Sequence, residues 1–316
     1  MATFDPCLTM RTPSRLRKLL TALRGLALPL AVLLVGGFVL STPSQHMRTC
    51  QVQAQLQPPP VQLKGEDALS QQLAFFTLGG IRSLVAEVLT LDATDAWLKR
   101  DWQRVQRRWD SATTLCPRRE NYWSSAAYEM YANAAGDAQT DFSLSPAEQV
   151  NRFRGYIAEG ERFMRDGITN NPHSWQLYVR RAEMYSNLYR RPQFAKAADD
   201  YAQAIRLGAP EYYKRFLFYS LCRVAGREVE AWRLGRELFN DPEHRLPSLV
   251  SLLFVLQHKI TVPAAQALPP ELLFRRTSWE SPAQVRRNAI EELEQMLHND
   301  LRFPINGIPE YLEKNR

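Results

Sequence analysis

The residue types that carry most enzyme chemistry occur in this sequence, but their spacing forms none of the usual sites. The chain has 316 residues and five histidines; no H-x3-H, H-E-x-x-H or C-x-x-C pattern is present. The phosphate loops G-x-x-x-x-G-K and G-x-G-x-x-G and the nucleophile motif G-x-S-x-G are also absent from the sequence. We therefore predict no metal, no cofactor and no enzymatic activity, with a dispersed Ser-His-Asp triad as an open alternative.

Two acidic residues stand side by side at Asp199 and Asp200, within a stretch whose apolar spacing predicts a helix. Paired carboxylates can bind a metal ion, and they are also common on the solvated face of a helix. Since the pair lies within a predicted helix, the sequence favours a solvated face over a metal site.

Basic residues are densest between Lys99 and Arg119, where seven Lys and Arg stand against two Asp. Such a patch could bind an anionic polymer or lipid head groups. However, Trp102, Val105 and Trp109 share one helical face, which favours an ordinary solvated helix whose tryptophans pack inward. A soluble protein that binds nucleic acid is a remaining alternative.

Most of the net charge of +7 lies near the N-terminus, because residues 1–48 hold six basic side chains and one acidic one. A charge-free, mostly apolar segment over 25–47 follows the basic leader 1–24. Basic residues before an apolar segment place that end in the cytoplasm. We predict a single transmembrane signal anchor in the inner membrane, with the bulk of the chain in the periplasm. A cleaved signal peptide and a buried soluble helix are the alternatives.

The segment after the predicted anchor and the cysteine content are both consistent with an anchored, exported chain. Residues 48–65 are rich in Gln and Pro and lack a helical or strand period, which is typical of an extended linker. The sequence has four cysteines at scattered spacing, and the anchor would leave an odd number of them outside. Cys116 and Cys222 are therefore predicted to pack as small hydrophobic residues.

The rest of the chain is predicted to be all-helical, because apolar residues recur at helical spacing from residue 66 onward and strand-like alternation is nearly absent. Ser145-Pro146 and Ser281-Pro282 each give a helix start, with Glu or Gln three residues after the serine. Residues 135–146 are predicted to be a loop. The predicted helices are 66–79, 81–98, 101–115, 120–134, 146–169, 174–190, 193–207, 211–224, 227–240, 247–259 and 281–298.

Small and large residues alternate at a recurring spacing along several of these helices. Steps of four and three join Gly160, Met164 and Gly167, and the same steps join Ala197, Tyr201 and Ala204. Small residues on either side of a large one allow two helices to approach closely. A proline follows each of these helices and ends it. The preceding helices carry a complementary spacing of three, one and three, as in Trp123, Ala126, Ala127 and Met130.

These patterns resemble the tetratricopeptide repeat (TPR) family, in which Trp, Leu-Gly and Tyr of a first helix precede Ala, an aromatic residue, Ala and Pro of a second. The resemblance covers residues 86–242, and its proline intervals are irregular. In addition, the run from Phe75 to Glu87 looks like the opening of a group of membrane-anchored bacterial repeat proteins. The resemblance implies an α-solenoid with N-terminal cap helices at 66–85 and a C-terminal helical cap and tail at 243–316.

Within that last region, two segments have clear predicted environments. Residues 247–259 are apolar on all sides and are expected to be buried. Residues 281–298 form an amphipathic pattern with Val285, Ala289, Leu293 and Met296 on one face, which suits the cap of a repeat array.

The TPR resemblance also implies a function, since TPR proteins hold ligands in a groove lined by the first helix of each repeat. We expect a non-catalytic, membrane-anchored scaffold that binds a protein or peptide. The residues that the resemblance places in this groove are Asn121, Ser124, Tyr128, Tyr131, Gln176, Glu183, Asn187, Tyr213 and Arg223.

Other functions stay open at this point. A structural subunit of an envelope, secretion or pilus-type assembly would have its groove filled by a neighbour, and a large apolar surface patch would favour it. A helical cell-wall hydrolase would be favoured by a deep pocket that holds an acid with a raised pKa.

Overall fold

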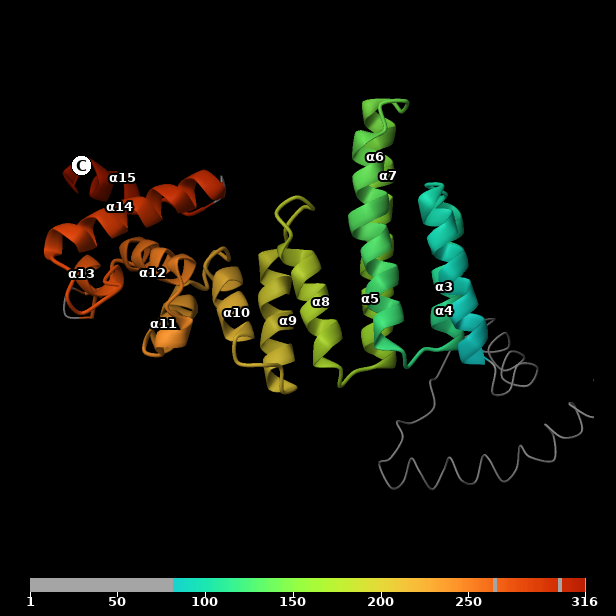
Figure 1. Cartoon of the computed structure of the whole chain (residues 1–316), viewed down its shortest axis with the longest axis horizontal. Helices are drawn as coiled ribbons and strands as arrows, with labels where there is room; N and C mark the ends of the chain where they lie inside the picture. The colour runs from blue at the N-terminus through green and yellow to red at the C-terminus, as the bar shows by residue number, and fades with distance from the viewer. Residues whose placement is uncertain (1–81, 264–265, 301–302, 316) are drawn as a thin grey trace, which may run out of the picture. The chain divides into compact units, whose positions relative to one another are not determined.

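The computed structural model describes residues 82–263, 266–300 and 303–315, and all regular structure in these ranges is helical (Figure 1). The prediction of an all-α chain is confirmed there. The predicted leader 1–24, anchor 25–47 and linker 48–65, with most of the cap 66–85, lie outside the described residues. Within the described ranges, no helix combines the length and the apolar character that a bilayer span requires.

The helices keep the labels of Figure 1. In chain order they are α3 (Arg82–Leu98), α4 (Trp102–Leu115), α5 (Glu120–Tyr128), η2 (Glu129–Ala134), α6 (Ala135–Thr140), α7 (Pro146–Asn170), α8 (Trp175–Ser186), α9 (Phe194–Arg206), α10 (Tyr213–Leu221), α11 (Glu228–Phe239), η3 (Pro242–His244), α12 (Pro247–Lys259), α13 (Pro270–Leu273), α14 (Pro282–Asn299) and α15 (Ile308–Asn315).

The helix starts follow the capping signals of the sequence. Ser145 accepts a hydrogen bond from the Glu148 amide, and the Glu148 side chain accepts one from the Ser145 amide, which completes a capping box. Ser281 caps α14 by accepting from the Gln284 amide. Both helices therefore begin where their Ser-Pro pairs predict.

The segment between residues 120 and 140 is one continuous helix rather than a helix followed by a loop. η2 is a π-helical stretch between α5 and α6, and the backbone keeps right-handed helical angles at both junctions. The predicted loop over 135–146 is therefore wrong up to Thr140. The helix continues because Ala135 and Ala138 are buried and their packing stabilises this turn. The Gly and Asp residues of the segment favour a loop by local propensity alone.

The described residues fall into two compact units, which we treat separately. The smaller unit includes residues 82–91 of α3 and 111–116 at the end of α4. In it, the Sγ atom of Cys116 lies 3.9 Å from the Oγ atom of Ser83. The larger unit includes residues 92–110 and all described residues from Pro117 onward, and it contains every cavity discussed below.

In the larger unit, each α-helix from α7 to α12 packs against the next one along the chain (Figure 1). α5, η2 and α6 pack on α7, and the succession then continues through α8, α9, α10, α11 and α12. The connections are short, as expected for neighbouring helices that reverse direction.

Glycines set the closest approaches between these helices. A Cβ atom added at Gly160 would lie 2.7 Å from Tyr131 Cβ, and one added at Gly167 would lie 2.7 Å from Trp123 Cβ. At Gly235 of α11, it would lie 2.5 Å from the Phe218 ring. The small residues in the recurring spacing therefore stand where two helices touch.

Three apolar clusters form the core of the larger unit. One centres on α5, η2 and α7, one on α8 and α9, and the largest on α10 to α15. α12 runs through the largest cluster, with residues 249–257 all buried, and α14 contributes Val285, Ala289 and Leu293. Both predicted environments in the C-terminal region are confirmed. Cys222 belongs to the same cluster as an unpaired, buried thiol.

Candidate functional site

Three of the nine predicted groove residues, Asn121, Ser124 and Gln176, line one open cavity of about 640 Å³ between the start of α5 and the start of α8. The cavity lies between two helices that the TPR resemblance expects to line a groove. The remaining lining residues are Arg118, Arg119, Glu120, Leu177 and Arg180.

Local contacts position the elements around this cavity. The guanidinium of Arg118 donates to the carbonyl oxygen of Asn170, so the turn before α5 is tied to the end of α7. The guanidinium of Arg119 lies 5.5 Å from the centre of the Tyr122 ring. Ser174 caps α8 by accepting from the Leu177 amide.

Basic side chains outnumber acidic ones in the lining of the cavity. Its lining holds three guanidinium groups and one carboxylate, that of Glu120. In addition, the Arg119 side chain at the N-cap of α5 makes no capping hydrogen bond, so the positive end of this helix adds to the field. The amide of Asn121 and the amide of Gln176 supply neutral donors and acceptors beside these charges. The arrangement suits a negatively charged chain segment.

Glu183 and Tyr128 lie further along the same helices. Glu183 Oε2 accepts a hydrogen bond of 2.9 Å from Nη1 of Arg180, which links it to the cavity wall. Tyr128 is 52% exposed, and its ring centre lies 5.8 Å from that of Tyr131. By contrast, Tyr131 is 8% exposed, and burial raises the pKa of its hydroxyl to about 12. Most of the Tyr131 surface is therefore unavailable to a partner.

The other three predicted residues lie elsewhere. Asn187 follows the end of α8, where its Oδ1 atom accepts from the Tyr189 amide and shapes the turn. Tyr213 of α10 packs between Trp175 and Tyr201, with ring centres 5.9 and 6.3 Å away. Arg223 lines a different cavity, which is described below.

The sequence reasoning missed the three arginines of the cavity. Arg118 and Arg119 form a pair immediately before α5, and Arg180 follows Gln176 by one helical turn. These spacings place the charges next to the predicted polar residues. The signal is thus present in the sequence, where Arg118 and Arg119 form the end of the basic stretch 99–119.

That basic stretch packs largely as the sequence predicts. Val105 is fully buried, and Trp102 and Trp109 are half-buried against the cluster around α5 and α7. Nε1 of Trp102 donates to Oδ2 of Asp137, 2.7 Å away.

Acidic residues of α3 bind much of the positive charge on α4. The guanidiniums of Arg104 and Arg108 both bind the carboxylate of Asp92, and these bonds hold the pKa of Asp92 below its usual range. Lys99 Nζ lies 2.7 Å from Oδ2 of Asp95. The patch is therefore partly neutralised by its own neighbours.

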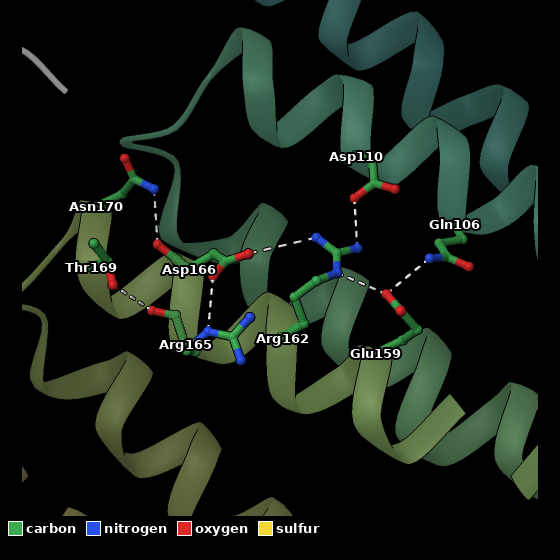
Figure 2. A network of polar contacts seen from close by, with 8 residues as sticks. All are labelled: Gln106, Asp110, Glu159, Arg162, Arg165, Asp166, Thr169 and Asn170. Atoms are coloured by element: carbon green, nitrogen blue, oxygen red, sulfur yellow. Dashed lines mark hydrogen bonds and ion pairs between the residues drawn. The ribbon is translucent and has the colours of Figure 1, made fainter. Parts of the chain in front are cut away.

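A second polar network joins α4 to α7 (Figure 2). Arg162 of α7 donates to Asp110 Oδ1 at 2.7 Å and to Glu159 Oε2 at 2.8 Å, and Gln106 donates to the same Glu159 oxygen at 2.9 Å. Asp166 lies 3.6 Å from the third nitrogen of Arg162. Burial raises the pKa of Asp110, and the bond from Arg162 opposes this shift. The network therefore connects α4 to α7 through several polar contacts.

The adjacent acids Asp199 and Asp200 have different environments. Asp199 is exposed, as predicted for a solvated face, and its carboxylate lies 2.8 Å from Nη1 of Arg227. Asp200, however, is buried and accepts two hydrogen bonds of 2.7 Å from Arg181 of α8. Burial raises the pKa of Asp200, and the two bonds from Arg181 counteract part of this effect. Asp200 therefore joins α8 to α9. Among the described residues, no group of acids, histidines and cysteines could hold a metal ion.

The π-helical stretch η2 is bound by an arginine from a distant loop. Arg190, between α8 and α9, donates from Nε to the Tyr131 carbonyl at 3.1 Å and from Nη2 to the Ala132 carbonyl at 3.0 Å. Its Nη1 atom donates to Oε1 of Gln139. A Cβ atom added at Gly136 would lie 2.8 Å from Nη2 of Arg190, so the glycine leaves room for this contact. Arg190 thus satisfies carbonyl groups at the point where the helix changes its pitch.

We expect Arg190→Ala to lower the free energy of unfolding by about 2 kcal/mol, because two partly buried hydrogen bonds from a charged donor to the carbonyls of Tyr131 and Ala132 are lost. Urea denaturation of the full chain in a mild detergent measures this loss. Arg191→Asn is the control, since Arg191 is exposed and asparagine tolerates its positive φ of 55°. Equal stabilities of the two variants would contradict a role for Arg190 in holding η2.

Comparisons with known proteins give no relative for this chain: no protein-family model matches the sequence, and neither a curated protein nor a solved structure matches it.

Proposed function

We propose that this chain is a non-catalytic, membrane-anchored α-solenoid of TPR-like helix pairs, and that its periplasmic part binds a segment of another protein. Two features support the repeat architecture. Each helix from α7 to α12 packs on its neighbour in the chain. Glycines stand at the closest contacts between helices, at the positions of the recurring sequence pattern. The basic leader and the apolar segment 25–47 support the anchor.

The ligand that fits the cavity between α5 and α8 best is an acidic, extended segment of a partner protein. The single observation that supports it most is the set of three arginines, Arg118, Arg119 and Arg180, around an open cavity that also presents Asn121 and Gln176. Guanidinium groups bind carboxylates through paired hydrogen bonds, and side-chain amides can bind the peptide backbone.

The test uses the full chain in detergent and a fluorescein-labelled, unstructured peptide rich in Asp and Glu. We expect the double variant Arg119→Ala/Arg180→Ala to bind the peptide about tenfold more weakly, a change of about 1.4 kcal/mol. Binding is expected to weaken as salt is added, because exposed charges are screened.

Two controls accompany this measurement. The double variant Arg154→Ala/Arg233→Ala removes the same charge from exposed positions outside the cavity, on α7 and α11, and is expected to bind like the unmodified chain. A peptide in which Asn and Gln replace Asp and Glu is expected to bind weakly. If both double variants lose affinity equally, net charge alone explains the binding and the proposed site is wrong.

A further inference from the structure

A second cavity is lined by residues of α9, α10, α12 and α14 and of the turn after α8, and its walls are mainly aromatic and aliphatic. Its volume is about 240 Å³. The apolar lining residues are Leu188, Phe194, Tyr201, Phe216, Tyr219, Leu252, Met296 and Phe303.

The hydroxyl groups in these walls are already bonded within the protein. The Tyr219 hydroxyl accepts from the Ser248 hydroxyl at 2.9 Å. The Ser220 hydroxyl donates to the Phe216 carbonyl, also at 2.9 Å. A ligand in this cavity would therefore find few hydrogen-bonding groups that need a new partner.

The charged groups of the cavity compensate each other. Arg223 donates from Nη2 to Asp300 Oδ2 at 2.6 Å and from Nη1 to the Tyr219 carbonyl at 2.9 Å, and its guanidinium lies 5.3 Å from the Phe194 ring centre. The Nε atom of Arg223 has no partner among the described residues, but it is shut off from solvent. The pair leaves the cavity without net charge, so neither an anion nor a cation is favoured there.

Size narrows the class of ligand further. Pockets that enclose a whole small molecule or cofactor have volumes of about 300–1,000 Å³. The present cavity is smaller and suits a single large side chain. Phe216 at its edge is 39% exposed, which leaves an aromatic surface in contact with water.

We propose that this cavity binds one bulky apolar side chain, aromatic or leucine, from an uncharged stretch of the partner segment. The inference rests on the proposed function, since it gives the partner a second feature besides its acidic stretch. The favourable term is the transfer of apolar surface out of water into a cavity that already exists. The Arg223–Asp300 ion pair then forms part of the cavity wall and contributes no net charge to ligand binding.

The test measures ligand binding in this cavity through an NMR signal of a lining residue, and it does not require the acidic peptide. The full chain is labelled with ¹³C at the methionine methyl groups and titrated with N-acetyl-phenylalaninamide. Met296 lines the cavity, whereas Met130, Met164 and Met184 are buried in other clusters and serve as references. We expect the Met296 methyl resonance, identified with Met296→Leu, to shift alone, and N-acetyl-aspartic acid amide to leave it unchanged.

A blocked cavity supplies the second arm of the experiment. Asn299 lines the cavity and is exposed, so a substitution there leaves the buried core unchanged. We expect the larger side chain of Asn299→Trp to cover the opening and to lower the apparent affinity for N-acetyl-phenylalaninamide about tenfold. Gln295→Trp places the same side chain at an exposed position of α14 outside the cavity, and is expected to have no effect.

Several outcomes would overturn the inference. These are a Met296 shift with the aspartic acid derivative as well, a shift with decanoate but not with the phenylalanine derivative, or a shift that depends on protein concentration alone. The second points to a lipid and the third to another copy of this chain. Loss of acidic-peptide binding with the Met296 response intact would instead refute only the proposed α5–α8 site.

Discussion

Gly167→Ala is expected to lower the free energy of unfolding by about 2–3 kcal/mol, although it adds a single methyl group. The new Cβ atom would lie 2.7 Å from Trp123 Cβ and 2.8 Å from Trp123 Cγ. These atoms cannot move aside easily, because Trp123 is 6% exposed and its Nε1 atom donates to the Pro117 carbonyl at 2.9 Å. Helices α5 and α7 would have to separate, and the cluster between them would lose contacts.

The same helix provides a matched control. Gly155 of α7 is exposed, and an added Cβ atom would meet nothing within 4 Å. Gly155→Ala should therefore raise stability by about 0.5–1 kcal/mol, because alanine in a helix interior loses less conformational entropy than glycine. Urea denaturation followed by far-ultraviolet circular dichroism measures both variants. Changes of the same sign would show that helix propensity, rather than close contact, governs position 167.

Asp200→Ala is expected to cost about 3 kcal/mol of stability, because it leaves the guanidinium of Arg181 partly buried without its carboxylate. The two hydrogen bonds of 2.7 Å between these side chains connect α8 to α9, and the Asp200 side chain is 8% exposed. The loss should appear as a lower denaturation midpoint with an unchanged dependence on denaturant.

The neighbouring residue is the control for this prediction. Asp199 is 71% exposed, and its ion pair with Arg227 is of the surface kind, so Asp199→Ala should change stability by less than about 1 kcal/mol. The double variant Arg181→Met/Asp200→Leu should be more stable than Asp200→Ala, because no charge remains buried. If Asp199→Ala and Asp200→Ala cost the same, the buried pair does not join the two helices as described.

Local signals in the sequence determined where two of the long helices begin. Ser145-Pro146 and Ser281-Pro282 carry their own caps, so each start depends on a few adjacent residues. The continuous apolar character of 247–259 likewise predicted its burial without knowledge of its neighbours. The spacing of Gly160 and Gly167 indicated a close contact between two helices, since small residues on one face allow another helix to approach.

The π-helical stretch could not be predicted, and it changes which residues face outward. Its stabilising partner, Arg190, comes from a loop far along the chain, so local propensity carries no sign of it. Each residue of an α-helix turns the chain by about 100°, so a widened turn shifts every later side chain around the axis. Tyr128 precedes η2 and is exposed, whereas Tyr131 lies within it and is buried.

In the candidate cavities, too, some features follow from the sequence and others only from the packing of distant helices. The TPR resemblance assigned Asn121, Ser124 and Gln176 to one groove, and these three residues line one cavity. Tertiary structure decided that Arg223 meets Asp300 in a separate apolar cavity, and that Asp200 rather than Asp199 is buried. Such pairings join distant segments and depend on how the helices pack, which a local residue pattern does not encode.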